Sequence, residues 1–381
     1  MKRFFRFVLV GAVAALLSAC GAKDNTLPPS PLVQFTPSIK VAQLWQTQVG
    51  NGDGGYYLRL QPAASQGVIY SSSYDGLVTA TNAKTGATLW QVNTRTNLTS
   101  GVAAGGGNVY VGTANAKIIA LSAKNGQVVW KTSVTSQVWA TPQYARGMVL
   151  VETMTGNLTA LSAVNGSRIW RYDEQVPSLI LHAASQPQVA NNNVIAGFSD
   201  GVLGVFNIQN GNVLWRVPIA LPKGSSIVEQ MVDITVNPIV VDGIVYVATY
   251  QGHIAALSLD NGQVIWQHKI SSFAGMTADG DRVYVTDADS RVWAFDESTG
   301  AVDWRQNNLL GRQATGPTLY NNNIVVVADR YGFMHFMSKS DGRFVGRVST
   351  GDGALAQPLS YNGNIYVYTS GGSLLAYRQY H

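Results

Sequence analysis

The chain has 381 residues, of which only 12% are charged and 39 are glycines. This composition argues against a disordered protein and against a helical bundle, because it suits many short strands joined by polar turns. The formal net charge of +5 comes without any run of Lys or Arg, so we expect no nucleic-acid partner.

Residues 1–19 are predicted to be a secretory signal peptide. They combine a basic start with an apolar run over 7–17, which is shorter than the roughly 18 residues that a membrane span needs. The segment leads into the motif LSAC at 17–20, which resembles the bacterial lipoprotein processing box. That resemblance implies cleavage before Cys20, lipid attachment to its thiol and, because Gly21 follows, sorting to the outer membrane. Cys20 is the only cysteine of the chain, so no disulfide is expected once it is lipidated.

Residues 20–40 are predicted to be the lipidated cysteine and a tether. The segment contains four prolines and shows no hydrophobic period. An extended Pro-rich spacer of this length reaches on the order of 60 Å. The remaining residues, 41–381, are predicted to form one folded domain.

One sequence motif is repeated through that domain. Glycine precedes tryptophan by four residues in six places, and a seventh copy has Gly346 where the others have Trp. The six pairs are Gly86/Trp90, Gly126/Trp130, Gly166/Trp170, Gly211/Trp215, Gly262/Trp266 and Gly300/Trp304. Counted from Trp45, successive end positions lie 38 to 51 residues apart, which brackets the length of a four-stranded propeller blade.

Each copy predicts a hairpin with its flanking strands. The glycine supplies the positive φ of a tight turn. The strand after the turn is predicted to be buried on both faces, with Val128 and Trp130 on one face and Val129 on the other. Sheets buried on both faces are stacked between two others, as in a propeller.

Eight copies of an earlier strand signal, from 68–73 to 364–369, predict eight blades. The last blade lacks an outer strand, whereas the segment around Trp45 has the outer-strand pattern with no strands before it. We therefore predict an all-β fold, an eight-bladed β-propeller of four-stranded antiparallel blades closed by the N-terminal strand joining the last blade. The blade tryptophans are predicted to be core residues wedged between neighbouring blades: Trp45, Trp90, Trp130, Trp170, Trp215, Trp266 and Trp304.

The chain contains little that predicts catalysis. Residues 197–201 match G-x-S-x-G, but a nucleophile elbow needs a helix after the turn and a strand follows here. The five histidines form no metal-binding pair, and the acidic turns at 279–281 and 287–289 lack the other ligands of a calcium loop. We expect no catalytic residue, no bound metal and no cofactor.

An enzymatic alternative comes from a second resemblance. Residues 295–304, FDESTGAVDW, resemble the tryptophan-docking repeat of the quinoprotein alcohol dehydrogenases, which are also eight-bladed. That resemblance implies a pyrroloquinoline quinone (PQQ)-dependent dehydrogenase or a degenerate relative without activity. Such enzymes commonly carry a vicinal disulfide beside the quinone, and a chain with a single cysteine cannot form one.

The repeat is longest around the fourth and fifth blades. The surplus lies after the outer strands, in residues 172–182 and 221–233, and connections of consecutive blades should emerge side by side on one rim. Aliphatic residues with acids nearby indicate a protein-binding surface there, unless they turn inward as innermost strands. These residues are Leu179, Ile180, Leu181, Ile227, Val228 and Met231, with Glu229 and Asp233. A further extra stretch, 50–55, is rich in glycine and is predicted to be a flexible loop.

Over essentially its whole length the chain resembles the BamB family of outer-membrane lipoproteins. The resemblance rests on the LSAC motif, the Pro-rich tether, the eight blades and the segments 176–182 and 233–240. It implies a non-catalytic scaffold of the β-barrel assembly complex, which lies at the outer membrane, faces the periplasm and aids assembly and insertion of β-barrel proteins.

The same resemblance implies a binding site for the POTRA domains of BamA. By position, it carries over the aliphatic residues Leu179 and Leu181 and the acid Asp233, whereas the family's Arg is His182 here and its second acid is Thr235. The predicted partner-binding residues are Leu179, Ile180, Leu181, His182, Glu229, Met231 and Asp233. Unfolded outer membrane proteins are a further candidate partner, through strand addition to exposed blade edges.

Overall fold

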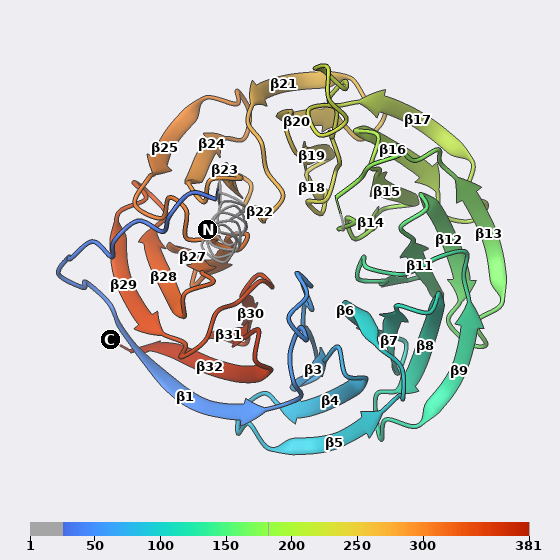
Figure 1. The fold of residues 1–381 in the computed structure, drawn as a ribbon, viewed down its shortest axis with the longest axis horizontal. Coiled ribbons are helices and arrows are strands. Elements are labelled where there is room, and N and C mark those ends of the chain that lie inside the picture. Colours follow the sequence, from blue (N-terminus) through green and yellow to red (C-terminus); the bar gives the residue numbers. More distant parts are fainter. Residues whose placement is uncertain (1–25, 182, 381) are drawn as a thin grey trace, which may run out of the picture.

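The computed structural model describes residues 26–181 and 183–380, so the predicted signal peptide, Cys20 and His182 lie outside the described residues. The described chain forms eight separate four-stranded antiparallel sheets. Figure 1 shows these sheets as blades arranged around one axis. The predicted eight-bladed propeller is confirmed.

The first four blades run in chain order from the inner to the outer strand. Blade 1 comprises β2 (Ala63–Ser65), β3 (Val68–Ser72), β4 (Leu77–Asn82) and β5 (Thr88–Asn93). Blade 2 comprises β6 (Leu98–Gly105), β7 (Asn108–Thr113), β8 (Lys117–Ser122) and β9 (Val128–Ser133). Blade 3 comprises β10 (Gln143–Ala145), β11 (Met148–Glu152), β12 (Asn157–Ser162) and β13 (Arg168–Asp173). Blade 4 comprises β14 (Gln188–Ala190), β15 (Asn193–Gly197), β16 (Val202–Asn207) and β17 (Val213–Pro218).

The other four blades repeat this order until the last. Blade 5 comprises β18 (Ile239–Val241), β19 (Ile244–Ala248), β20 (His253–Ser258) and β21 (Val264–Lys269). Blade 6 comprises β22 (Gly275–Ala278), β23 (Arg282–Thr286), β24 (Val292–Asp296) and β25 (Val302–Gln306). Blade 7 comprises β26 (Thr318–Tyr320), β27 (Ile324–Ala328), β28 (Phe333–Ser338) and β29 (Phe344–Ser349). Blade 8 comprises β30 (Leu359–Tyr361), β31 (Asn364–Tyr368), β32 (Ser373–Tyr380) and β1 (Lys40–Gln48).

The ring closes between the two ends of the chain, as predicted. β1 pairs antiparallel with β32, and Trp45 lies opposite Ala376. Figure 1 shows β1 as the outer strand of the blade whose other three strands come from the C-terminal part of the chain. The last sheet therefore gains its fourth strand from the opposite end of the sequence, and no blade is left incomplete.

Each blade tryptophan docks on the next blade. Trp130 is buried and its Nε1 donates to the carbonyl oxygen of Ala163 at 3.0 Å. A Cβ on Gly166 would lie 2.6 Å from Cε3 of this ring, so only glycine lets the indole rest on the turn. The same Nε1-to-carbonyl bond joins Trp45 to Ala83, Trp90 to Ala123, Trp170 to Ile208, Trp215 to Leu259, Trp266 to Glu297 and Trp304 to Lys339. Each Gly-to-Trp motif thus contributes to two interfaces between blades. Its glycine receives the tryptophan of the preceding blade, and its tryptophan docks on the following blade.

The seventh copy shows why its tryptophan is missing. The next blade has no turn glycine before its outer strand, because that strand is β1 from the N-terminus. Ile39 fills the place of the indole: a Cβ on Gly346 would lie 2.9 Å from its Cγ1. Ile39 also packs against the core cluster shared by blades 7 and 8.

The prediction that the outer strands are buried on both faces is wrong for every blade but blade 7, where Phe344 and Val345 are buried. Val129 is 46% exposed although its neighbour Trp130 is 8% exposed. A β-bulge lies just before the tryptophan and breaks the alternation: Ala120 pairs with Trp130 and Leu121 with Val128, which leaves Val129 unpaired. The bulged residues of the eight blades are Leu44, Leu89, Val129, Ile169, Leu214, Ile265, Asp303 and Val345.

The strands buried on both faces are the second and third of each blade. In β7 the residues from Val109 to Thr113 are all buried. The hydrophobic clusters lie between blades rather than within one; one of them joins Tyr110 and Ile118 of blade 2 to Val149 and Leu161 of blade 3. Burial of apolar area between facing sheets therefore stabilises the ring.

The predicted free tether over 20–40 is wrong for residues 27–39, which we call the strap. Ser30 N donates to Leu310 O at 2.8 Å, and Ser38 N donates to Val345 O at 2.9 Å. Between them, the ring of Phe35 lies 5.5 Å from that of Phe344, centroid to centroid. The prolines favour an extended chain, but that chain runs along the outside of blades 6 and 7 instead of through solvent.

The glycine-rich stretch 50–55 is likewise held, and the prediction of a flexible loop is wrong. Asp53 N donates to Ser370 O at 3.0 Å and Tyr74 N donates to Gly52 O at 2.9 Å. A Cβ on Gly52 would collide with the backbone of Ser370. The glycines are needed because the backbone packs closely between blades 8 and 1. In the described part of the chain, no helix is long and apolar enough to cross a membrane.

Candidate partner-binding face

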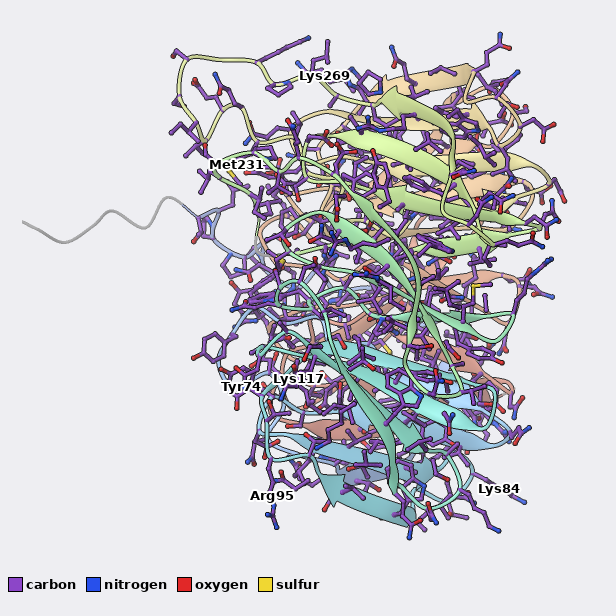
Figure 2. The ribbon with its side chains drawn as sticks, turned by 90° about the vertical axis from the view of Figure 1, so that its right-hand side faces the viewer. Tyr74, Lys84, Arg95, Lys117, Met231 and Lys269 are labelled. Atoms are coloured by element: carbon purple, nitrogen blue, oxygen red, sulfur yellow. The ribbon has the colours of Figure 1, made fainter. Side chains whose placement is uncertain are left out.

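One face of the ring carries the connections from each outer strand to the next inner strand. We call it the connector face. Two of its connections contain the predicted partner-binding residues: the first connector, residues 174–187, and the second connector, residues 219–238. Figure 2 shows Met231 and Tyr74 on this side of the ring, at the left, whereas Lys84 in the turn of blade 1 lies on the opposite side.

The two connectors lie side by side and are tied to each other. Leu181 N donates to Oδ1 of Asp233 at 2.9 Å, and Gln186 N donates to Oδ1 of Asn237 at 2.8 Å. The second connector is tied in turn to the blade 4 turn, where Ile234 N donates to Phe198 O at 3.1 Å. The backbone of Leu181 is therefore held by a side chain of the second connector.

The aliphatic side chains of the connectors differ in exposure. Leu179 is 40% exposed, Ile180 and Leu181 are half-buried, and Met231 is buried. The most exposed aliphatic residues of the two connectors are at the tip of the second connector, where Leu221, Ile227 and Val228 stand out from the ring. Leu179, with the edges of Ile180 and Leu181, forms a smaller apolar surface on the first connector.

The expectation that Asp233 is a surface acid is not met. Its side chain is fully buried, Oδ1 accepts the Leu181 N–H, and Oδ2 has no hydrogen-bond partner among the described residues. Burial raises the pKa of Asp233 to about 6, and the charge of Asp200 adds to the rise. The carboxyl group of Asp233 accepts a hydrogen bond from a backbone amide of the first connector. It therefore positions that connector and does not present a charge at the surface.

Replacing Asp233 with Asn is expected to make the protein more stable at neutral pH. Because the pKa of Asp233 is raised in the folded state from 3.8 to about 6, its stabilising contribution is complete below pH 3.8 and is lost as the pH rises through 6. The neutral amide avoids that loss, so the variant should exceed the parent in unfolding free energy by on the order of 1–3 kcal/mol at pH 7. Urea unfolding at pH 7 and pH 4.5 measures this. A difference between the two proteins that does not shrink at the lower pH would contradict it.

Glu229 is the exposed acid of the second connector. Its Oε2 accepts the N–H groups of Ser225 and Ser226 at 2.9 and 3.0 Å. These hydrogen bonds, from Ser226 and then Ser225, lower the pKa of Glu229, so the residue is charged at neutral pH. Glu229 both closes the turn that forms the tip and presents negative charge beside it.

A buried acidic group lies behind the connectors. Glu152 is buried at the end of β11, and burial, with the nearby charge of Asp200, holds its pKa well above the ordinary value. Arg216 compensates part of this group: its Nη2 lies 2.5 Å from Oε2 of Glu174 and 4.0 Å from Oδ2 of Asp200. Burial also raises the pKa of Asp200, so both this acid and Glu152 are less readily ionised than exposed carboxyl groups.

Arg59 is a structural residue of this face that the sequence did not reveal. It lies in the connection from blade 8 to blade 1, yet its Nη1 and Nη2 donate to Phe273 O at 2.7 Å and Thr235 O at 3.0 Å. The side chain therefore crosses the axis of the ring and holds the second connector from the inside. No repeat signal could have found it, because its two hydrogen bonds reach segments that are far away in the sequence.

An axial cavity of about 500 Å³ lies beneath Arg59. Amide and hydroxyl side chains near the inner strands of most blades line it together with apolar ones such as Trp139 and Met276, and Arg59 is the only charged residue among the described residues that line it. No three His, Cys, Asp or Glu side chains within residues 26–181 and 183–380 converge as metal ligands would.

Comparisons with known proteins agree on one family. A family model described as Outer membrane protein assembly factor BamB matches residues 74–306. A protein of that name from Legionella pneumophila (strain Paris) is 44% identical over 375 residues, which cover 96% of this chain and 97% of the relative. The crystal structure of BamB from Moraxella catarrhalis matches with a TM-score of 0.81 at 26% identity and covers 89% of this chain and 100% of that one.

The enzymatic alternative is matched only in fold. A quinohemoprotein alcohol dehydrogenase from Comamonas testosteroni matches with a TM-score of 0.70, over 95% of this chain and 82% of that one. Its sequence identity is 14%, so the likeness shows a shared propeller and nothing about chemistry.

Proposed function

The chain belongs to the family of the outer membrane protein assembly factor BamB, and on that basis we propose that it is a non-catalytic lipoprotein scaffold of the β-barrel assembly complex. Its role is in outer membrane assembly, and its place is at the outer membrane. The finer proposal is that it is anchored through Cys20, faces the periplasm and binds the POTRA domains of BamA through the connector face.

The observation that carries the proposed interface is the exposure of Leu179 on a fixed backbone. An aliphatic side chain that is 40% exposed, on a connector tied by Asp233, is preorganised to enter an apolar pocket of a partner. Small clusters of such anchors provide most of the binding free energy of protein interfaces. Ile180 and Leu181 extend the apolar contact, and Glu229 supplies charge at its rim.

The other predicted residues take supporting roles in this proposal. Met231 is a buried residue of the second connector, and Asp233 orients Leu181 through its backbone N–H. Because neither side chain reaches the surface, each would affect the partner by changing the shape of the connectors. His182 lies outside the described residues, and its partner-binding role stays a prediction.

Replacing Leu179 with Asp is expected to abolish co-purification with BamA. A carboxylate placed in an apolar contact loses its hydration without gaining a counter-charge, which weakens binding by more than about tenfold. The measurement is recovery of BamA with the tagged protein from membranes, together with a thermal unfolding curve of each variant.

Val129→Asp is the matched control. Val129 is an aliphatic residue of similar exposure, 46%, on the outer strand β9, away from the connectors. It should leave BamA recovery unchanged. Equal recovery of BamA with the Leu179 variant and its control, both folded, would refute the proposed interface.

A further inference from the structure

The strap delivers the chain to the connector face. Ser30 N and Oγ donate to Leu310 O and Asn308 O, both at about the normal hydrogen-bond distance, 2.8 and 2.9 Å. Further toward the N-terminus, the carbonyl oxygen of Pro28 lies where a Cβ on Gly311 would be only 2.3 Å away. Residues 308–311 belong to the connection between blades 6 and 7, so the described chain begins on the connector face.

Two arginines hold the strap in this course. Nη1 of Arg312 donates to Ser30 O at 3.0 Å, and Nη1 of Arg347 donates to Val33 O at 3.0 Å. Arg312 is itself fixed by Asp329, with 2.6 Å between Nε and Oδ2. The guanidinium of Arg347 also lies 5.0 Å from the centre of the Phe35 ring. These contacts restrain the strap from Ser30 onward.

The docked strap sets an upper limit on the distance between the propeller and Cys20. Only residues 21–26 lie between Cys20 and the strap, and six residues span at most about 20 Å even when fully extended. A lipid on Cys20 would therefore hold the connector face close to the bilayer instead of at the end of a long tether.

The tip of the second connector has the side chains for an interfacial contact. Leu221, Ile227 and Val228 are 63%, 59% and 58% exposed, and Lys223 lies between them in the sequence. The carboxylate of Glu229, which follows Val228, is turned back onto the backbone N–H groups of Ser225 and Ser226. Figure 2 shows the connector that leads to Met231 projecting from the same side as the blue N-terminal segment. Exposed aliphatic residues beside a lysine suit the boundary between acyl chains and headgroups.

We propose that the tip formed by Leu221, Ile227 and Val228 contacts the lipid surface of the outer membrane's inner leaflet, as a second attachment beside the N-terminal anchor. This inference rests on the proposed lipidation of Cys20. The occupant is a lipid surface because the chain leaves the propeller on this face with about 20 Å of reach. The apolar side chains of the tip then lie on lipid, whereas the first connector, with Glu229 at its rim, faces the protein partner.

The test places a fluorescent probe on the tip of the full-length lipidated protein. Lipid consumes the thiol of Cys20, so Val228→Cys provides a single site for an environment-sensitive dye. The protein is reconstituted into vesicles of phosphatidylethanolamine and phosphatidylglycerol that contain a lipid-borne quencher, and flotation of the same sample is recorded. Lys84→Cys, on the opposite side of the ring, is the matched control.

We expect a blue shift and quenching at position 228 and neither effect at position 84. Releasing the strap with Ser30→Pro and Phe35→Ala should reduce the quenching at 228, because more residues then separate Cys20 from the point where the chain is held on the propeller. Protein that floats without quenching at 228 would overturn this inference alone, whereas protein that does not float would overturn the anchor as well. A blue shift at 228 that occurs only after addition of BamA periplasmic domains would assign the tip to the protein partner instead.

Discussion

Replacing Trp130 with Ala is expected to lower the free energy of unfolding by about 3–5 kcal/mol. The indole is 8% exposed, sits against the turn of blade 3 and lies 5.9 Å from the ring of Tyr110, centroid to centroid. The substitution removes this packing and leaves the carbonyl oxygen of Ala163 without its donor. Urea unfolding with comparison of midpoints and slopes measures the loss.

The adjacent residue provides the control for this experiment. Val129 is also apolar, but the β-bulge turns it outward, where it is 46% exposed. Val129→Ala should change the free energy of unfolding by no more than about 0.5 kcal/mol. Similar losses for the two variants would contradict the assignment of the tryptophans to the interfaces between blades.

Replacing Asp329 with Ala is expected to cost a similar amount, about 3–5 kcal/mol. Its carboxylate is fully buried; Oδ2 accepts from Nε of Arg312 at 2.6 Å and lies 2.9 Å from Nε2 of His335. Burial by itself would raise the pKa of Asp329, but these bonds outweigh it and hold the pKa below its ordinary value. Without the carboxylate, the cation of Arg312 stays buried and uncompensated.

His335 shares in this network as a neutral ring. Burial lowers the pKa of His335, and its Nδ1 accepts a hydrogen bond from Nε of Arg347 at 3.1 Å. The proton therefore lies on Nε2, toward Asp329. Because Arg312 and Arg347 both hold the strap, Asp329→Ala should also make residues 27–39 more susceptible to protease.

Asp341→Ala is the control within the same blade. Asp341 pairs with Arg343 at 2.8 Å, but the two side chains are 48% and 63% exposed. An exposed pair of this kind contributes less than about 1 kcal/mol. If the two aspartate variants were equally stable and the strap equally resistant to protease, the buried network would not hold the structure as described.

Blade number and ring closure could be predicted because both follow from a sequence repeat. Blade-sized spacing of the Gly and Trp positions fixes the module, and the orphan strand at Trp45 fixes how the ring closes. The inference that the sheets are stacked was right, although it was drawn from the wrong strand. The strands buried on both faces are the second and third of each blade, not the outer one that carries Trp130.

The bulge explains why periodicity failed at that strand. Alternation assigns a side chain to a face only while the ladder is regular, and one unpaired residue before each tryptophan shifts the register. The prediction of a tether was wrong for a related reason. Proline content predicts an extended chain, but whether that chain is free or docked depends on Arg312 and Arg347, which lie far away in the sequence.

The place of the connectors was predicted correctly, whereas their partner-binding role stays a prediction. Their surplus length and aliphatic residues are visible in the sequence, and the resemblance to the BamB family implies the same segments. The burial of Asp233 and the hold of Arg59 on Thr235 are visible only after folding, since both depend on residues from other blades.

By itself, the sequence determined the eight-bladed ring, its closure and the two long connections that interrupt the repeat. These features depend on the spacing of residues within and between repeats, which can be read directly along the chain. Only the tertiary structure decided which aliphatic residues face outward, which acid is buried and where the N-terminal segment runs. Those outcomes depend on contacts between segments distant in sequence, and pattern along the chain does not encode their geometry.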